Sequence, residues 1–303
     1  MREDLPLITV IITTYNRVNL LEKAILSVIR QTYKNLEIII SDNHSEDGTE
    51  ELCKKYAKTD SRIKYFRQEK NIGMPANTNF AHSKSNGEYT HVLCDDDWLD
   101  EDFIEKSYEE IRKNPEFNYI CPTVKLYDGD NNFLSEAKKI NLSCSKISDR
   151  IKNYVYAAKN HSSITNGLMK NDVTKAMLEE DGYAIGYRFA EDWVYVVKYL
   201  IAGKCKMIST THYNKLNNGY TTNLKNMTEL WNDPTLTYEN FYQNVLKTIQ
   251  NSINNDNFCK NRLNEKERKE CCKKAEQGLL TKHGSHNIRN LLKFLKGYFT
   301  IRY

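Results

Sequence analysis

The sequence predicts an α/β protein in which a mostly parallel, Rossmann-like central sheet is flanked by helices and followed by a helical C-terminal extension. Three observations carry this prediction. The first hundred residues alternate β-rich runs with segments of helical periodicity. The β-rich runs are continuously apolar, as expected for strands that are buried on both faces. Polar residues follow each of these runs at its carboxyl end.

The elements of the first hundred residues follow in a regular order. The expected strands are residues 7–16, 36–41, 62–68 and 88–94. The expected helices between them are residues 20–32, 50–57 and 74–85, the first marked by apolar residues at positions 20, 21, 24, 25, 28 and 29. The resulting order of strand and helix predicts a doubly wound sheet.

Composition and cysteine usage place the chain among ordinary globular proteins. Of its 303 residues, 40% are hydrophobic and 28% are charged. No apolar run is long enough to span a bilayer, and the first sixteen residues read as a strand and not as a signal peptide, so we expect a cytoplasmic protein. Eight scattered cysteines without a Cys-x-x-Cys pair argue against a structural zinc site and indicate reduced thiols.

The net charge of +4 conceals an asymmetry along the chain. Residues 260–303 carry twelve Lys and Arg against four Asp and Glu, so the rest of the chain is net negative. Helices are expected over 236–253, 265–280 and 287–299, and the last of these is amphipathic and basic. Such a helix is suited to peripheral contact with an anionic membrane surface, or to packing on the catalytic domain with its basic face in water. No nucleic-acid-binding fold accompanies the charge, so nucleic acid is not an expected partner.

Polar groups converge at one edge of the predicted sheet. In open α/β sheets, ligands bind beyond the carboxyl ends of the strands. The groups that stand at these ends are residues 13–17, 41–43, 71–73 and 95–97. One such group is an ordinary turn, but four together indicate a binding site.

The acidic triplet Asp95, Asp96 and Asp97 is the sharpest of these features. Adjacent carboxylates repel one another unless a cation lies near them. Carboxylate oxygens suit Mg²⁺ or Mn²⁺, and one or two of them suffice when phosphate oxygens complete the coordination. The alternative is an acidic turn in which Asp100 caps a following helix, which explains Asp100 and Glu101 but leaves the strand-end aspartates unexplained. We therefore favour a metal–diphosphate site.

Four sequence motifs together resemble a known protein family. Taken in order, "VIITTYNR", "IIISDNHSEDGT", "NIGMPANTNFAHSKSNGEYTHVLCDDDWL" and "RFAEDWVY" resemble the family 2 glycosyltransferases, which have the GT-A fold. The resemblance covers about residues 7–215. It implies a GT-A catalytic domain over residues 1–215, with a nucleotide-sugar half over about 1–100 and an acceptor half over about 101–215. Residues 216–303 then form the basic, helical C-terminal region.

The resemblance also implies an inverting enzyme that uses a nucleotide-sugar donor and a divalent ion. Asp95 and Asp97 form the D-x-D element, and the resemblance implies that both are metal candidates, with Asp97 the first of them. It also implies that Asp95 or Asp96 contacts the ribose. Asp42 accepts a hydrogen bond from the base, which favours uracil and hence a UDP-sugar. The donor-nucleotide residues that the resemblance assigns in the other strand ends are Thr13, Tyr15, Arg17, Asn71 and Gly73.

Inverting transfer requires a base on the acceptor side, because the attacking hydroxyl loses its proton as the new bond forms. Glu191 and Asp192 stand at the start of a predicted helix and match the family's Glu-Asp motif. We choose Asp192 as the base and Glu191 as the reserve. The alternative is that both acids have only a structural role, in which the positive end of the helix dipole stabilises their negative charges.

Two further segments resemble parts of the family's site. Residues 159–172 correspond to the segment beneath the acceptor, where His161 and Asn166 are candidates for sugar contacts. Residues 211–223 correspond to the loop that closes over the donor. There His212 and Lys215 are candidates for contact with the diphosphate.

The resulting hypothesis is a metal-dependent glycosyltransferase that moves a sugar from a nucleotide-sugar to a glycan or lipid-linked acceptor in surface polysaccharide or lipooligosaccharide synthesis. We expect it in the cytoplasm or at the inner face of the cytoplasmic membrane. A sugar-nucleotide pyrophosphorylase is the first alternative, but the segment after the first strand lacks the Gly-rich phosphate loop that such an enzyme needs. The second alternative is a catalytically dead nucleotide- or glycan-binding module, against which the acidic triplet and the Glu-Asp pair argue.

Overall fold

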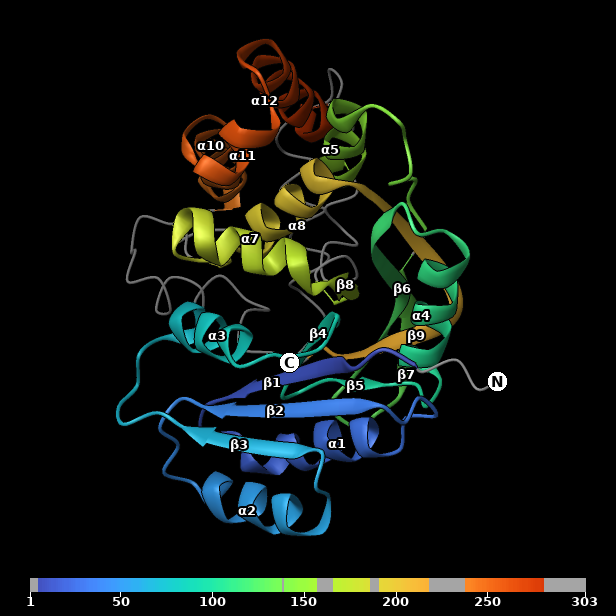
Figure 1. Cartoon of the computed structure of the whole chain (residues 1–303), viewed down its shortest axis with the longest axis vertical. Coiled ribbons are helices and arrows are strands. Elements are labelled where there is room, and N and C mark those ends of the chain that lie inside the picture. The colour runs from blue at the N-terminus through green and yellow to red at the C-terminus, as the bar shows by residue number, and fades with distance from the viewer. Residues whose placement is uncertain (1–4, 138, 157–165, 186–190, 218–237, 281–303) are drawn as a thin grey trace.

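The computed structural model describes residues 5–137, 139–156, 166–185, 191–217 and 238–280 (Figure 1). Its strands are β1 Ile8–Thr14, β2 Leu36–Asp42, β3 Ile63–Arg67, β4 Tyr89–Cys94, β5 Trp98–Leu99, β6 Phe117–Tyr127, β7 Phe133–Glu136, β8 Leu168–Lys170 and β9 Lys204–Leu216. Its helices are α1 Val18–Ile29, α2 Thr49–Thr59, α3 Met74–Ser83, α4 Phe103–Lys113, α5 Ile147–Tyr156, α7 Asn171–Asp181, α8 Glu191–Ala202, α10 Tyr238–Asn255, α11 Asn257–Arg262 and α12 Glu265–Leu280.

The described strands form one sheet in the order β3-β2-β1-β4-β8-β6-β9-β5, with β7 added to β6. The first four strands in this order are parallel to one another, as the sequence predicts. Beyond β4 the sheet becomes mixed, because the short strand β8 runs antiparallel to both β4 and β6. The predicted α/β fold class is therefore confirmed, with an N-terminal parallel half and a mixed second half.

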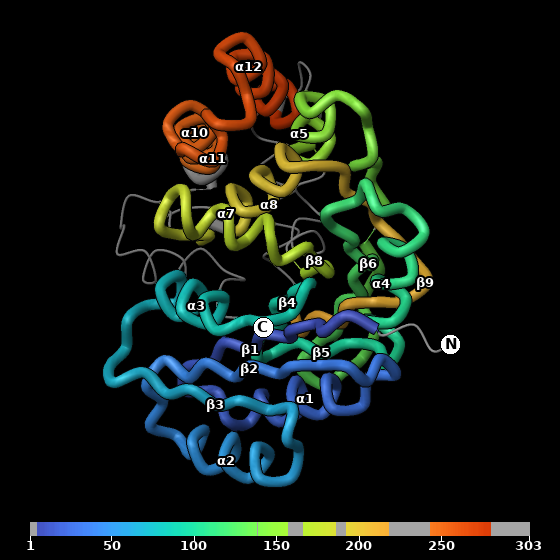
Figure 2. Tube along the Cα trace, in the orientation of Figure 1, coloured from blue at the N-terminus to red at the C-terminus, as the bar shows by residue number. Residues whose placement is uncertain are grey.

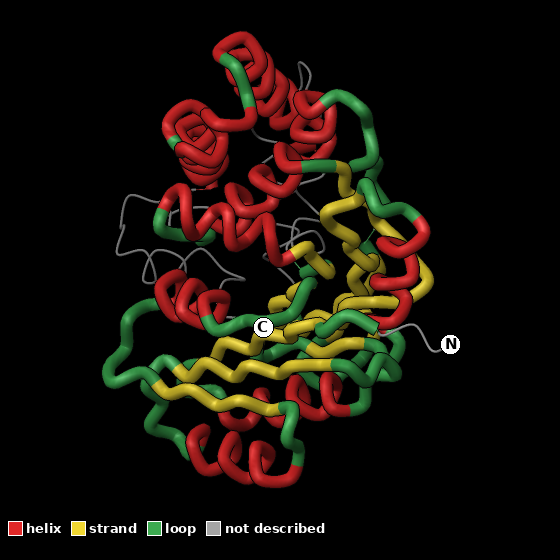
Figure 3. The backbone as a smooth tube through the Cα atoms, viewed as in Figure 1, coloured by secondary structure: helices red, strands yellow, loops and turns green. Residues whose placement is uncertain are grey.

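Helices cover both faces of the parallel half (Figures 1 and 3). Because side chains alternate along a strand, Val10 and Ile12 pack in the same cluster as α1, whereas Ile11 packs with Ala81 of α3. All three β1 side chains are fully buried. This double burial is the reason that the strand appears in the sequence as one continuous apolar run.

The helical C-terminal region shares its core with α8 and with the mixed half of the sheet. Residues of α10, α11 and α12, among them Ile249, Phe258 and Ala275, belong to the same buried cluster as Val196 and Leu200 of α8. Figure 2 shows α10, α11 and α12 at the end of the molecule remote from α1 and α2. The bounds of α12 agree with the predicted helix over 265–280. Among the helices that the structure describes, none combines the length and hydropathy needed to cross a bilayer.

The segment after the acidic triplet differs from expectation. Trp98 and Leu99 form a short strand paired with β9, so α4 begins only at Phe103, with Asp102 and not Asp100 at its N-cap. The carboxylate of Asp100 instead accepts hydrogen bonds from Asn214 and, at 2.8 Å, contacts Nδ1 of His212. Residues 211–216 belong to the end of β9 and not to a loop. The capping interpretation of Asp100 is therefore wrong.

Glu37 joins three neighbouring strands through one buried carboxylate. It accepts hydrogen bonds from Thr9 Oγ1 and Lys64 Nζ, each at 2.6 Å, and from the backbone and side-chain amides of Asn86. Thr9 lies on β1, Lys64 lies on β3 and Asn86 precedes β4. Burial alone would raise the pKa of Glu37, but the bonds from Lys64, Thr9 and Asn86 outweigh it and lower the pKa to about 2.

We predict that Glu37→Gln lowers the free energy of unfolding by about 3 kcal/mol at neutral pH. The folded-state pKa of this carboxyl lies below its unfolded value. Its contribution is therefore present above the ordinary glutamate pKa and is lost as the pH falls toward about 2. Urea denaturation at pH 7 and at about pH 3 measures the difference, with the exposed Glu101→Gln as the control. A difference of equal size at both pH values would contradict this account.

Candidate active site

The parallel register brings three strand ends to one place. Thr14 of β1 pairs with Asp42 of β2, and Thr13 pairs with Cys94 at the end of β4. The acidic triplet follows Cys94 directly, so the residues after β1, β2 and β4 lie side by side at the carboxyl edge. Three of the four strand ends that the sequence singled out are thereby gathered on adjacent strands.

The turn after β1 is held in a fixed shape by the loop after β2. Asn16 adopts a left-handed conformation with φ of 51°, which asparagine tolerates better than most residues. Its backbone N–H donates to Ser45 Oγ, and its side-chain oxygen accepts from the N–H of Glu46. The carboxylate of Asp47 accepts from the N–H of Val18 at the start of α1. These bonds fix the direction in which the side chain of the intervening Arg17 leaves the backbone.

Arg17 reaches back to the acidic triplet. Its Nη1 donates to Oδ1 of Asp95 and to Oδ2 of Asp96, each at 3.1 Å. Burial raises the pKa of Asp95, and the repulsion from Asp96 adds to this effect, while the nearby Arg17 opposes it. Asp95, which the family resemblance pairs with Asp97 as a metal ligand, is thus engaged by a guanidinium in the structure.

Asp97 occupies a different environment from its two neighbours. It is 2% exposed, and its carboxylate accepts from Tyr213 OH at 2.6 Å and from the N–H of Leu216 at 2.9 Å. Burial raises the pKa of Asp97 to about 7, opposed by the charge of Lys215 and assisted by that of Asp96. A cation at this position would therefore replace solvation that the folded chain has removed.

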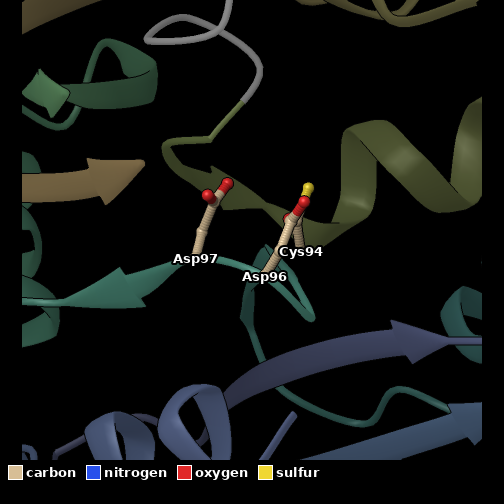
Figure 4. Close-up of side chains that lie close together, drawn as sticks. All are labelled: Cys94, Asp96 and Asp97. Carbon is tan, nitrogen blue, oxygen red and sulfur yellow. The ribbon is translucent and has the colours of Figure 1, made fainter. Parts of the chain in front are cut away.

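Asp96, Asp97 and Cys94 form a set that fits a divalent cation. One ligand atom from each lies within 4.8 Å of the others, and Figure 4 shows the three side chains pointing to the same side of the chain. Two carboxylates suit Mg²⁺ or Mn²⁺, and a thiol tolerates Mn²⁺ better than Mg²⁺. Of the two aspartates predicted as metal ligands, the set contains Asp97 but has Asp96 in place of Asp95. It also adds Cys94, which the sequence interpretation overlooked although it adjoins the triplet.

Asp42, the predicted partner of a nucleotide base, is held at the end of β2 by two hydrogen bonds. One oxygen of the fully buried Asp42 carboxylate accepts from the N–H of Ser45 at 2.8 Å, and the other accepts from Tyr65 OH at 2.7 Å. These bonds fix the orientation of the carboxylate, and Arg67 Nε lies 3.8 Å from its Oδ2. The ring of Tyr15 is 44% exposed at the end of β1.

Asn71 and Gly73 lie beside this region in a loop held by Asn43. The side chain of Asn43 donates to Asn71 Oδ1 at 2.8 Å and accepts from the N–H of Ile72 at 2.9 Å. Asn71 Oδ1 also accepts from the N–H of Gly73. Gly73 has φ of 84° and ψ of 153°, a conformation that only glycine adopts readily. The loop after β3 is therefore joined to the end of β2.

The candidate base lies on the other half of the molecule. Asp192 is an exposed residue in the first turn of α8, and its Oδ1 accepts from the N–H of Trp193 at 3.0 Å. Its charge adds to the effect of burial in raising the pKa of Tyr154 on α5. Glu191 is the first residue of α8, and its side chain lies outside the described part of the chain.

The remaining candidates have different surroundings. The imidazole of His212 lies between two carboxylates, with Nδ1 at 2.8 Å from Asp100 and Nε2 at 3.5 Å from Glu136. Lys215 contributes its charge at Asp97 and Cys94, so it adjoins the acidic cluster. Asn166 is buried, and His161 lies outside the described residues.

Tyr213 is a site residue that the sequence interpretation missed. It is fully buried, and its hydroxyl donates to Asp97 and contacts the backbone N–H of Cys94. Its only sequence signal is its position two residues before Lys215, which places both side chains on the same face of β9. Without knowing that β9 pairs with β5, that signal identifies no partner.

Comparison with solved structures shows which fold class this architecture belongs to. The structure of S. aureus TarS residues 1–349 in complex with UDP-GlcNAc matches 97% of this chain and 81% of that chain, with a TM-score of 0.64 and 16% sequence identity. At this identity the likeness shows the fold alone. The class is that of GT-A enzymes, with the strand ends gathered at one edge.

Comparison with sequence families is more specific. The profile described as glycosyl transferase family 2 matches residues 9–179, more than half of the chain. This chain therefore belongs to the family 2 glycosyltransferases.

Curated relatives agree with this assignment. Glycosyltransferase GlyA of Streptococcus pneumoniae is 40% identical over 104 residues, which are 34% of this chain and 15% of GlyA. The GalNAc(5)-diNAcBac-PP-undecaprenol beta-1,3-glucosyltransferase of Campylobacter jejuni is 44% identical over 96 residues, 31% of each chain. An uncharacterized glycosyltransferase of Methanocaldococcus jannaschii is 26% identical over 234 residues, 72% of this chain and 79% of that protein. The chain thus spans less than a third of two of these three relatives.

We predict that Asp97→Asn weakens the binding of UDP in the presence of Mn²⁺ by about tenfold or more. The variant removes the charge of a buried carboxylate in the set that fits a cation, so binding of UDP without metal should change little. Isothermal titration calorimetry with and without Mn²⁺ measures both affinities. Asp130→Asn, in the exposed β6–β7 turn, is the matched control. Equal affinity of Asp97→Asn and the unmodified protein for the UDP–Mn²⁺ pair would remove Asp97 from the metal site.

Proposed function

We propose that the protein is a metal-dependent inverting glycosyltransferase that uses a UDP-sugar and transfers the sugar to a hydroxyl of a glycan or lipid-linked acceptor. The observation that carries this proposal is the acidic cluster at the carboxyl edge, where Asp96 and Asp97 converge beside Arg17 and Lys215. Two carboxylates for a cation and two basic side chains for a diphosphate are the groups that a nucleotide-sugar needs.

The donor half follows from the strand ends. We infer that Asp42, held by Ser45 and Tyr65, accepts the imide N–H of a pyrimidine such as uracil. Tyr15 offers an exposed ring near the same edge. The complexes of S. aureus TarS with UDP and with UDP-GlcNAc support a uridine donor for a chain of this fold.

The cation would be held by Asp96 and Asp97. When bound, Mg²⁺ or Mn²⁺ supplies positive charge that stabilises the departing nucleoside diphosphate. Tyr213 positions Asp97 by its hydrogen bond, and the N–H of Leu216 holds the second oxygen of the same carboxylate. The chain thus fixes one carboxylate rigidly and leaves the other, Asp96, shared with Arg17.

The acceptor half supplies the base. Inversion is a direct displacement at the anomeric carbon, so the acceptor hydroxyl gives up its proton on the side away from the leaving diphosphate. We propose that Asp192 takes this proton, because it is exposed at the start of α8 and belongs to the segment that matches the family's Glu-Asp motif. Glu191 is the reserve. The Campylobacter jejuni relative is named for an acceptor glycan linked to undecaprenol, and this supports an undecaprenol-linked or similar glycan acceptor.

The first test of the proposed donor is calorimetric binding of UDP, GDP, dTDP and CDP, each with and without Mn²⁺. We expect UDP to bind with a dependence on Mn²⁺, and CDP to bind more weakly, because cytosine lacks the imide N–H that Asp42 would recognise. Binding of none of the four nucleotides would refute the proposed function.

We predict that Asp192→Asn preserves the affinity for UDP and Mn²⁺ but lowers kcat by about a hundredfold or more, the usual effect of removing a general base. Release of UDP from a UDP-sugar in the presence of an acceptor measures turnover, and calorimetry measures donor binding. Glu191→Gln, at the preceding position, is the matched control and should retain most of the activity. If the two variants exchange these behaviours, Glu191 is the base; unchanged turnover in both would exclude the pair.

A further inference from the structure

Arg17 makes an unusual pair of contacts for a residue at a diphosphate site. One nitrogen of its guanidinium, Nη1, donates to both Asp95 and Asp96. The Asp95 and Asp96 side chains are 7% and 12% exposed, and that of Arg17 is 31% exposed. In the free protein the guanidinium of Arg17 is therefore the cation that contacts these two carboxylates.

The position of Arg17 is built into the fold. Arg17 is the N-cap residue of α1, and its carbonyl oxygen accepts from the N–H groups of Leu20 and Leu21. The left-handed Asn16 before it and the N–H of Val18 after it are both bonded to the loop after β2. Because the backbone is held on both sides, the side chain of Arg17 leaves it in the direction of the triplet, which the guanidinium contacts.

Asp96 belongs to two sets at once. It is bonded to Arg17, and it also lies with Asp97 and Cys94 in the set that fits a cation. A divalent cation that binds Asp96 lies near the guanidinium bonded to the same carboxylate. Two positive charges so close together repel each other strongly in a partly buried site. A diphosphate carries the negative charge that relieves this repulsion, and its oxygens are suitable acceptors for a guanidinium.

We propose that Arg17 is the resident counter-ion of the acidic triplet, and that it makes the binding of the divalent cation and of the nucleotide diphosphate mutually dependent. In the free protein Arg17 offsets part of the negative charge of Asp95 and Asp96 and disfavours the binding of the cation alone. When cation and diphosphate arrive together, the cation takes Asp96 and the guanidinium turns to the diphosphate. This inference rests on the proposed function, and by linkage the two ligands strengthen each other's binding by the same factor.

The test is the affinity for Mn²⁺ alone and in the presence of saturating UDP, measured from the electron paramagnetic resonance signal of free Mn²⁺. We expect Arg17→Met and Arg17→Gln to bind Mn²⁺ alone about tenfold more tightly than the unmodified protein, because a repelling charge is removed. The factor by which UDP strengthens Mn²⁺ binding should fall by about tenfold or more in both variants. Arg17→Gln can still donate a hydrogen bond to the triplet, so this variant keeps the test valid if Arg17→Met does not fold.

Two control variants separate position from charge. Lys54→Met removes one positive charge from the exposed face of α2 and should leave both affinities unchanged. Arg17→Lys keeps the charge and should bind Mn²⁺ alone as weakly as the unmodified protein. If Arg17→Gln binds Mn²⁺ alone no more tightly than the unmodified protein, while the unmodified protein still binds the UDP–Mn²⁺ pair, this inference is overturned and the proposed function stands. If the unmodified protein does not bind the pair, the proposed function itself fails.

Discussion

The rest of this site depends on one electrostatic constraint, namely that three adjacent carboxylates are packed into the end of a buried strand. Their mutual repulsion and their loss of water must be offset by positive charge and by hydrogen bonds. The structure provides both, through Arg17 for Asp95 and Asp96, and through Tyr213 and a backbone N–H for Asp97. The three aspartates are therefore not equivalent, although the sequence presents them as a uniform run.

This constraint explains why elements far apart in the chain meet at the triplet. Arg17 comes from the start of α1 and is oriented by the loop after β2, while Tyr213 comes from β9, which joins the sheet through β5 and β6. The parallel half thus supplies the guanidinium, and the mixed half supplies the hydroxyl. The acidic cluster is therefore built from both halves of the sheet, so the ends of β1 and β4 are joined to the strand that follows α8.

The packing of the C-terminal helices indicates that they support α8. α10, α11 and α12 bury apolar side chains against α8, the helix that carries the candidate base Asp192 in its first turn. The fully buried Lys198 of α8 lies at 2.9 Å from Asp181 of α7 and at 3.0 Å from Asp256 between α10 and α11. A buried cation with two carboxylates is stable only when its partners are held in place, so these helices support α8. The basic helix expected over 287–299 lies outside the described residues.

The sequence by itself determined the parallel half of the fold and the edge on which the site lies. Continuous apolar runs such as β2 are typical of strands covered on both faces, and in such a sheet the polar strand ends gather on one side. The tertiary structure decided which carboxylate faces which partner. Asp95 turns to Arg17, Asp97 turns to Tyr213, and Asp100 binds His212 and Asn214 where the sequence indicated a helix cap. Side chains in a turn have no periodicity to reveal their direction, so these choices depend on long-range pairings, above all β5 with β9, that no local pattern encodes.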